Sequence, residues 1–312
     1  DPRMIESTLR STGDFLHRRR VELAVLLAMN ALYFFAFFQR IAVPGTIFNE
    51  LQSDFHATAS AVAGLGAIYL YVYASMQFVA GALCDRFGAG RVCIWGGLLL
   101  SVGSILFPLL PGLPLLYVVR ALVGLGSSLI YLSIVKALDR LFPPDQFPKY
   151  LGLTVFLGYA GGLAGTFPFE RAVSAIGWRH ALLVAALVCA AAAVVASLLL
   201  TRVQRMQFSI QRGSMRLLAA VLLNRQGLPL LIVWALNFSI YLLVQATIGK
   251  KLLLDYLGMS SASAALFTFM MMLTTMFAAL SGGFLLRLTQ YRRKPMIFVS
   301  LFCTLGAVVL LF

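Results

Sequence analysis

Long runs of apolar residues alternate with short polar segments along almost the whole chain. Nine of these runs are long enough to cross the hydrocarbon core of a bilayer as a helix, which takes about 20 residues. They lie near residues 22–43, 60–83, 91–110, 113–137, 149–175, 180–201, 227–248, 262–286 and 295–312. Because an open sheet leaves backbone groups unsatisfied in lipid, this pattern predicts an all-α polytopic membrane protein with nine transmembrane helices.

The composition favours a membrane protein over a soluble one. Of the 312 residues, 61% are hydrophobic and 12% are charged, whereas soluble domains have about 45–50% and about 25%. A net charge of +14 would suggest a nucleic-acid partner for a soluble protein. Here the charges collect in the short segments between apolar runs. We therefore expect the lipid bilayer, and no nucleic acid, as the partner of this chain.

Basic residues are divided unequally between the two sets of connecting segments. With the N-terminus in the cytoplasm, the cytoplasmic segments hold 19 Lys and Arg residues and the opposite loops hold 4. Cytoplasmic loops carry the excess of basic residues in membrane proteins. This asymmetry predicts a cytoplasmic N-terminus, and we expect the protein to lie in a bacterial inner (plasma) membrane.

The longest connecting segment follows the sixth span and divides the spans into six and three. It predicts four parts: a cytoplasmic N-terminal segment (1–20), an N-terminal six-helix bundle (21–201), a cytoplasmic linker (202–226) and a partial C-terminal bundle (227–312).

The loop between the second and third spans reads GALCDRFGAGR over residues 81–91. It resembles the signature loop of the major facilitator superfamily, G-x-L-[AS]-D-R-x-G-R-[KR], and departs from it at Ala89-Gly90. Small residues let membrane helices approach closely, and glycine permits a tight turn. We expect a charged latch here that forms in one conformation and breaks in the other, although a simple solvated loop is the alternative. The candidate latch residues are Gly81, Asp85, Arg86, Gly88 and Arg91.

A weaker copy of this loop occurs 201 residues later, where Gly282, Arg287 and Arg292 match and Leu286 replaces the aspartate. Internal repeats are characteristic of transporter folds. The resemblance implies a fold of twelve helices, of which this chain holds the six of the N-terminal bundle and the first three of the C-terminal bundle. Since the chain also begins at Asp1, we expect it to be part of a longer protein, with a truncated relative as the alternative.

Two arginines, Arg40 and Arg120, lie inside predicted spans. A central arginine costs about 2.5–3.5 kcal/mol on insertion scales, so such residues are candidates for function. The only acids within spans, Glu22 and Glu170, lie near span ends. Arginine pairs well with carboxylate and phosphate, so the pattern predicts an anionic substrate. Snorkelling of Arg40 to the interface and interhelical bonding by Arg120 are the alternatives.

Polar and aromatic residues recur at helical spacing along spans one, four and seven, which line the central cavity in the family that the chain resembles. A polar stripe is unfavourable against lipid, so we expect it to face protein or water. Hydrogen bonding between helices is the alternative to substrate contact. Besides the two arginines, the candidate substrate-binding residues are Asn30, Tyr33, Tyr131, Asn237, Tyr241 and Gln245.

These features predict a secondary active transporter that moves a small organic or phosphorylated anion by alternating access. An arginine late in the first helix is loosely similar to the organic-anion branches of the superfamily. A coupling ion, and the choice among symport, uniport and antiport, stay open. The sequence has no P-loop and no Ser/His/Asp spacing, so we expect neither an enzyme nor a cofactor or metal. A non-transporting membrane sensor or assembly factor is the alternative.

Overall fold

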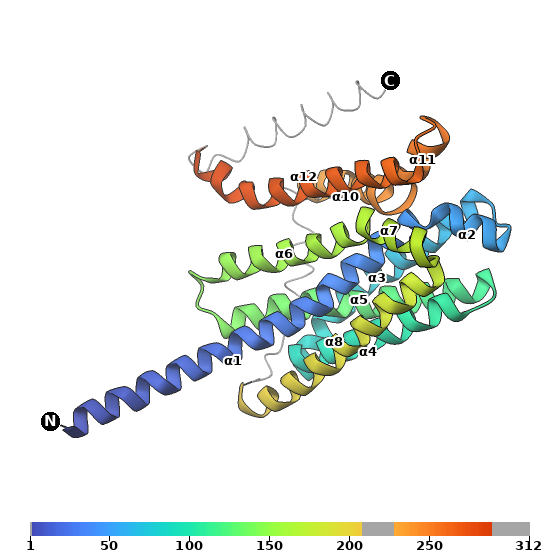
Figure 1. The fold of residues 1–312 in the computed structure, drawn as a ribbon. Helices are drawn as coiled ribbons and strands as arrows, with labels where there is room; N and C mark the ends of the chain where they lie inside the picture. The colour runs from blue at the N-terminus through green and yellow to red at the C-terminus, as the bar shows by residue number, and fades with distance from the viewer. Residues whose placement is uncertain (1, 208–227, 289–312) are drawn as a thin grey trace.

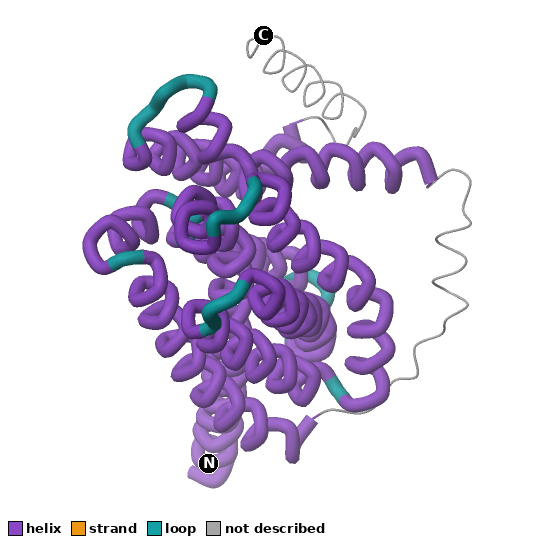
Figure 2. Tube along the Cα trace, turned by 90° about the vertical axis from the view of Figure 1, so that its right-hand side faces the viewer, coloured by secondary structure: helices purple, strands orange, loops and turns teal. Residues whose placement is uncertain are grey.

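The computed structural model describes residues 2–207 and 228–288, and this part of the chain is helical and without strands. Figures 1 and 2 show the helices lying side by side as a bundle. The long helices are α1 (Pro2–Ile41), α3 (Ala59–Phe87), α4 (Ala89–Leu106), α5 (Leu113–Leu141), α6 (Phe147–Ala164), α8 (Trp178–Gln207), α10 (Leu228–Leu243) and α12 (Ser261–Leu288). The prediction of an all-α fold is confirmed.

Short elements connect several of these helices. They are α2 (Phe48–Phe55), α7 (Phe167–Ile176) and α11 (Gly249–Asp255), together with the irregular helical turns η1 (Ala42–Thr46), η2 (Phe107–Leu109) and η3 (Val244–Ile248). Figure 1 shows α2, α7 and α11 at the same end of the bundle. We call this the Lys250 end, and the opposite end, where α3 finishes, the Asp85 end.

Six stretches of the described residues are long and apolar enough to cross a membrane: Arg20–Thr46, Ala59–Gln77, Ala89–Leu109, Leu113–Leu141, Phe147–Ile176 and Trp178–Thr201. They coincide with the first six predicted spans. The seventh and eighth predicted spans fall on α10 with η3 and on α12, whereas the ninth lies outside the described residues. The first helix begins at Pro2, so it includes the segment predicted to precede the first span.

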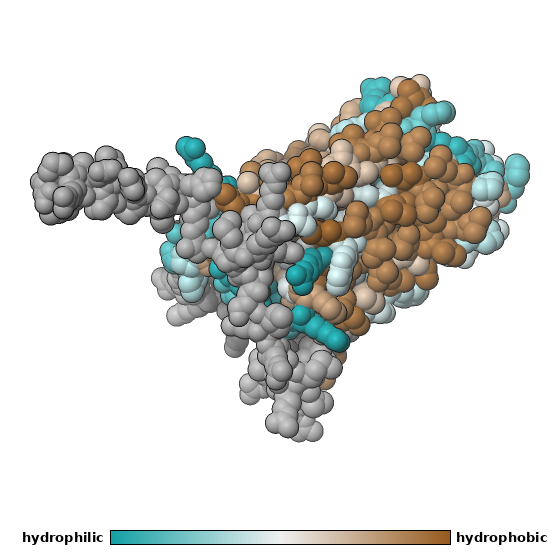
Figure 3. All heavy atoms as spheres, turned by 90° about the horizontal axis from the view of Figure 1, so that it is seen from below, coloured by the Kyte–Doolittle hydropathy of each residue, from teal (hydrophilic) through white to brown (hydrophobic). Residues whose placement is uncertain are grey.

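The outer surface of the bundle is apolar. Figure 3 shows apolar residues covering the middle of the described face, with polar residues toward both ends. On α8, Val184, Leu187, Val195 and Leu198 are 55–57% exposed. A contiguous apolar surface of this kind is expected where a helix faces lipid tails.

A proline ends the first helix. Pro44 has no amide hydrogen, and it disfavours the helical conformation of the residue before it. Val43 accordingly adopts φ −122° and ψ 120°, and η1 begins at this break. The backbone of η1 packs closely on η3, because a Cβ at Gly45 would lie 2.8 Å from the carbonyl oxygen of Ala246. The two irregular turns therefore meet at the Lys250 end.

Glycines also set the distance between α1 and α6. A Cβ at Gly161 would overlap the backbone carbonyl of Phe34. Small residues at such positions let helices approach closely, and close packing is the main stabilising contact between helices in a membrane. Gly161 therefore serves the packing of α6 on α1.

We expect Gly161→Ala to lower the stability of the protein, because the methyl group would push α6 away from α1. Overpacking of this kind typically costs about 1–3 kcal/mol. Thermal melting of the purified protein in detergent measures the effect. Gly152→Ala on the same helix is the matched control, since a Cβ there meets nothing within 4 Å. Equal melting temperatures for the two variants would contradict the packing role.

Candidate functional site

Arg120 lies on α5, and only 1% of the residue is exposed. Its guanidinium donates to three backbone carbonyl oxygens, those of Val43 at 2.7 Å, Gln39 at 3.3 Å and Leu65 at 3.4 Å. The Tyr69 ring lies 4.6 Å from its Cζ. Two of the carbonyls belong to α1 and to the break at its end, where helical hydrogen bonding stops. Arg120 therefore supplies hydrogen bonds at the break and joins α5 to α1 and α3.

Arg40 lies at the end of α1 and is 4% exposed. Its Nε donates to the Tyr69 hydroxyl at 3.4 Å, but its Nη2 is buried without a hydrogen-bond partner among the described residues. The rings of Phe37 and Tyr73 each lie 4.5 Å from its Cζ. A buried cation without an anionic partner is unfavourable. Arg40 thus keeps one nitrogen that can donate to an anion, whereas all three guanidinium nitrogens of Arg120 already donate to carbonyl oxygens.

Tyrosines from four helices gather around Arg40. Tyr33 of α1 stacks on Tyr131 of α5, with ring centroids 5.3 Å apart. Tyr69 and Tyr73 of α3 stack at 6.1 Å, and Tyr159 of α6 contacts the ring of Phe37 at 5.5 Å. We call Tyr33, Tyr69, Tyr73, Tyr131 and Tyr159 the tyrosine cluster. The rings of Tyr69 and Tyr73 lie 5.8 and 4.5 Å from the Arg40 Cζ and attract the cation.

A narrow crevice adjoins the two arginines. Its lining comes from α1, α3, α5 and η3, and consists of Arg40, Gly66, Tyr69, Leu70, Arg120, Ala246 and Thr247. The crevice is therefore shared between the helices before the predicted linker and those after it.

The other predicted substrate-binding residues are less closely gathered. Gln245 in η3 donates to the carbonyl of Thr268 at 3.0 Å, and Tyr241 donates to the sulfur of Met272 at 3.1 Å. Asn30 donates to the carbonyl of Leu26 on its own helix at 2.8 Å. The side-chain oxygens of Asn30 and Gln245 are buried without a partner in the described part of the chain.

For one predicted substrate-binding residue, only the backbone is described. Asn237 lies in α10, and its side chain is outside the described residues. The structure thus brings together Arg40, Arg120, Tyr33 and Tyr131, and places Gln245 beside the crevice residues Ala246 and Thr247.

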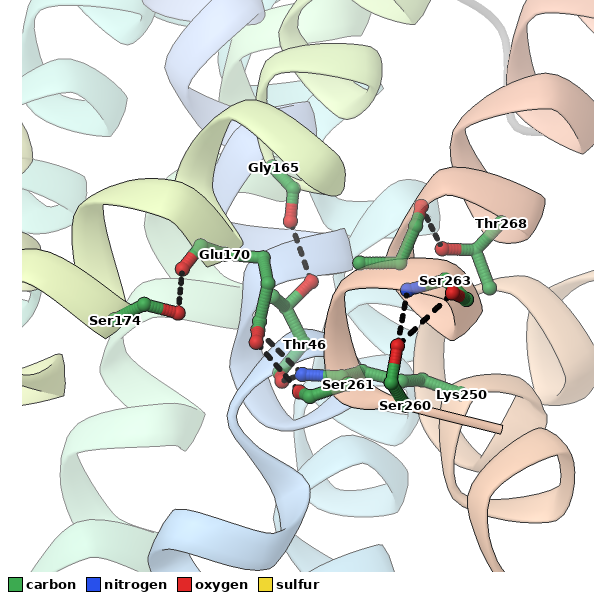
Figure 4. A network of polar contacts seen from close by, with 10 residues as sticks. Thr46, Gly165, Glu170, Ser174, Lys250, Ser260, Ser261, Ser263 and Thr268 are labelled. Atoms are coloured by element: carbon green, nitrogen blue, oxygen red, sulfur yellow. Dashed lines mark hydrogen bonds and ion pairs between the residues drawn. The ribbon is translucent and has the colours of Figure 1, made fainter. Parts of the chain in front are cut away.

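A buried ion pair crosses the Lys250 end (Figure 4). Glu170 of α7 and Lys250 of α11 pair directly, and their side chains are 3% and 5% exposed. Lys250 also donates to the Thr46 carbonyl at 2.7 Å, and Ser261 of α12 donates to Glu170 Oε1 at 2.5 Å. The network joins η1 and α7 to α11 and α12. We call these four residues the Lys250 network.

This network was not predicted from the sequence, where Lys250 is one of the four basic residues in the opposite loops and Glu170 an acid near a span end. Opposite charges at the same-side ends of the fifth and seventh spans were the available signal. Glu50 of α2 also faces Lys250: burial raises the pKa of its carboxyl group, while Lys250 acts in the opposite direction.

The candidate latch residues lie at the Asp85 end. Asp85 forms an ion pair with Lys136 of α5, which also donates to the Gly81 carbonyl at 3.2 Å. Gly88 has a φ of 88°, which favours glycine. Arg86 and Arg91 are exposed. The partner of Asp85, Lys136, was not among the predicted residues, because nothing local in the sequence links it to the loop.

The side chains in the weaker copy of the loop lie outside the described residues. Gly282, Leu286 and Arg287 lie in α12 with side chains outside the described residues, and Arg292 lies beyond them.

We expect Arg120→Lys to lower the melting temperature of the purified protein. A single ammonium cannot reproduce the planar, forked hydrogen bonds to three carbonyls. Each buried carbonyl left unsatisfied costs about 1–3 kcal/mol. Arg140→Lys, near the cytoplasm-proximal end predicted for the same helix, serves as the matched control. An unchanged melting temperature in Arg120→Lys would show that Arg120 does not stabilise the helix break.

A family model described as "Major Facilitator Superfamily" matches residues 29–312. The chain is 36% identical over 110 residues to the "Uncharacterized transporter YybO" of Bacillus subtilis, covering 35% of this chain and 25% of that protein. It is 25% identical over 160 residues to the "Probable sulfoacetate transporter SauU" of Cupriavidus necator, covering 51% and 37%.

A third relative is the chloroplastic "Probable anion transporter 3" of Arabidopsis thaliana, 31% identical over 111 residues, covering 35% of this chain and 22% of that protein. The matched segments therefore span less than two-fifths of these relatives. A crystal structure of a variant of the peptide transporter POT in complex with sulfate has a TM-score of 0.50 and 16% identity, covering 72% of this chain and 45% of that chain. This likeness concerns the fold.

Proposed function

We propose a transport function from the premise that the chain belongs to the Major Facilitator Superfamily, whose family model covers residues 29–312. In this proposal the protein is a secondary transporter that moves a small organic or phosphorylated anion across the membrane by alternating access. Six helices long enough to span a membrane and an apolar outer surface support its place in the bilayer.

The unpartnered guanidinium nitrogen of Arg40 carries the choice of an anion. Arg40 is buried among aromatic rings, and no carboxylate among the described residues pairs with it. A carboxylate, sulfonate or phosphate oxygen would supply the missing acceptor and offset the cost of the buried charge. Arg40 is the proposed contact residue, while Arg120 holds the helix break that positions it.

Tyrosines complete the proposed site. The hydroxyl groups of Tyr33, Tyr131 and Tyr159 are available to hydrogen-bond a polar solute, and their rings provide an apolar wall. Asn30, before the predicted linker, and Gln245, after it, each have a side-chain amide oxygen without a hydrogen-bond partner among the described residues. Two of the relatives, the sulfoacetate transporter and the anion transporter, carry names that agree with an anionic substrate.

Alternating access needs two parts that move against each other around a site. The predicted division into residues 1–20, 21–201, 202–226 and 227–312 supplies these two parts. Residues 1, 208–227 and 289–312 of these ranges lie outside the described chain. With the N-terminus in the cytoplasm, the Lys250 end faces outward. The Lys250 network then closes the outer side in this conformation, and the Asp85 end faces the cytoplasm.

We expect Arg40→Gln to weaken anion binding about tenfold to a hundredfold, which corresponds to the loss of a charged hydrogen bond worth about 1.5–3 kcal/mol. Isothermal titration of purified protein with sulfoacetate, lactate and inorganic phosphate measures the affinity. Arg20→Gln, an exposed position on the same helix, is the matched control.

Two results would count against this proposal. Equal affinities in Arg40→Gln and Arg20→Gln would remove Arg40 from the site. Binding without uptake into proteoliposomes would favour a non-transporting sensor with the same fold.

We expect Asp85→Asn to slow uptake into proteoliposomes with little change in melting temperature. The pair with Lys136 is partly exposed, and such pairs contribute about 0–1 kcal/mol to stability. Its proposed role is to favour one conformation. Reversal of the pair, with Asp85→Lys and Lys136→Asp together, should restore uptake. Failure of the reversed pair alongside normal uptake in Asp85→Asn would exclude a latch.

A further inference from the structure

Glu170 and the two side chains that donate to its carboxylate come from opposite sides of the predicted linker. Lys250 of α11 contacts Oε2, and Ser261 of α12 contacts Oε1. Each carboxylate oxygen thus has one donor, and both donors belong to the C-terminal part. Glu170, on α7, belongs to the N-terminal part. Figure 4 shows the three side chains pointing toward one another.

The receiving side has the features of a carboxylate receptor. Lys250 is almost fully buried, so its ammonium requires an anion or strong acceptors. Ser261 is the first residue of α12, and the positive end of a helix dipole favours an anion. The Ser263 amide donates to Ser260 Oγ at 3.2 Å, so this helix end is already capped and keeps Ser261 free for Glu170.

Other charged groups nearby are accounted for. Lys251 pairs with Asp255 at 2.8 Å, and Asp54 pairs with Arg179 at 3.7 Å. Glu50 is the second carboxyl group that faces Lys250, and its Oε2 has no hydrogen-bond partner within residues 2–207 and 228–288. The direct partner of Lys250 is therefore Glu170.

Separation of the two parts at this end would empty the receptor. The acceptors of Lys250, Glu170 and the Thr46 carbonyl, both belong to the N-terminal part and would leave together. Lys250 and Ser261 would remain on the C-terminal part, open to the outer solution and arranged around the place of a carboxylate.

We propose that Lys250, Ser261 and the start of α12 form a second, carboxylate-binding site, which Glu170 occupies when the outer side is closed. When this end opens, the site binds the carboxylate of an incoming solute. The inference rests on the proposed transport of anions. Closure brings Glu170 back to Lys250, and the displaced anion then passes to Arg40, since Lys250 lies three residues beyond the crevice residue Thr247.

This arrangement makes Glu170 an internal competitor of external carboxylates. An external carboxylate that binds Lys250 excludes Glu170, so by linkage it favours the open conformation. A single carboxylate group on a solute fits this site, because each of its two oxygens can accept a hydrogen bond from one of the two donors. The competition gives a test that does not require the natural substrate, because acetate can serve as the probe.

The experiment measures opening through a cysteine introduced at Thr46, in the intact protein with its native cysteines replaced. Thr46 is buried inside the closed network, so an impermeant maleimide added from outside labels it only after opening. We expect acetate to increase the labelling rate, whereas chloride at the same ionic strength does not. Glu170→Gln should raise basal labelling and lower the half-maximal acetate concentration about tenfold, because an attached competitor acts at a high effective concentration.

Two variants separate carboxylate binding from a simple tie. Lys250→Met should raise basal labelling and abolish the acetate response. Reversal of the pair, with Glu170→Lys and Lys250→Glu, should restore slow labelling, because the two parts are tied again, but it should show no acetate response. Glu50→Gln is the control carboxylate and should keep the response.

The proposal would be overturned by a wild-type protein that does not respond to acetate, or by a response that survives Lys250→Met. The acetate response should persist in Arg40→Gln. If the acetate response persists in Arg40→Gln while titration shows that Arg40 does not bind anions, the outer site stands and only the proposed transport site fails. Loss of the response in Arg40→Gln would assign it to Arg40 and remove the second site.

Discussion

The break in the first helix, held by Arg120, determines where the rest of the site lies. Pro44 ends regular hydrogen bonding, and the carbonyls of Gln39 and Val43 turn to a guanidinium from α5. In lipid an unsatisfied backbone group costs several kcal/mol, so such a break requires a donor from a neighbouring helix. The same bond fixes the last turn of α1, which carries Arg40, and the start of η1, which leads to Thr46. The crevice and the Lys250 network both depend on this contact.

The irregular turns η1 and η3 suggest why both sites lie near one end. Their first residues are 202 positions apart, close to the 201-residue spacing of the repeated loop. Irregular backbone at membrane depth is tolerated only where protein or a cavity covers it, and the two turns cover each other. Their close approach leaves no room for a side chain at Gly45, where a Cβ would lie 2.8 Å from the Ala246 carbonyl oxygen. Polar groups from both repeats are thereby brought to one place.

Much of the fold followed from the sequence because membrane helices obey two strong constraints, length and apolarity. The first six spans matched to within a few residues, and the break between α6 and α7 at Gly165–Thr166 fell inside a single predicted span. The prediction could not foresee it, since hydropathy reports the environment of a segment and not its continuity. The ninth span and most of the linker are untested, because residues 208–227 and 289–312 lie outside the described residues, whereas 202–207 continue α8.

The site was predictable in part, for a related reason. Charge within a span is visible in the sequence, so Arg40 and Arg120 were identified, but their partners were not. Arg120 is bound by backbone carbonyls, which leave no trace in side-chain patterns, and Arg40 is surrounded by Tyr69, Tyr73 and Tyr159 from other helices. Only the packing distinguishes a guanidinium whose three nitrogens each have a carbonyl partner from one with an unpartnered nitrogen.

Under the proposed function, the distribution of charge favours a path for anions from the Lys250 end inward. Lys250, Arg40 and Arg120 are buried cations, and Glu170 is the acid that directly pairs with one of them in the described part of the chain. An excess of buried positive charge is costly unless an anion relieves it. Glu170 relieves it at Lys250 and backbone carbonyls bind Arg120, so in the proposed function Arg40 is the cation that a solute anion would pair with. Under the proposed function, such a protein would hold an anion most strongly where its own carboxylate cannot reach.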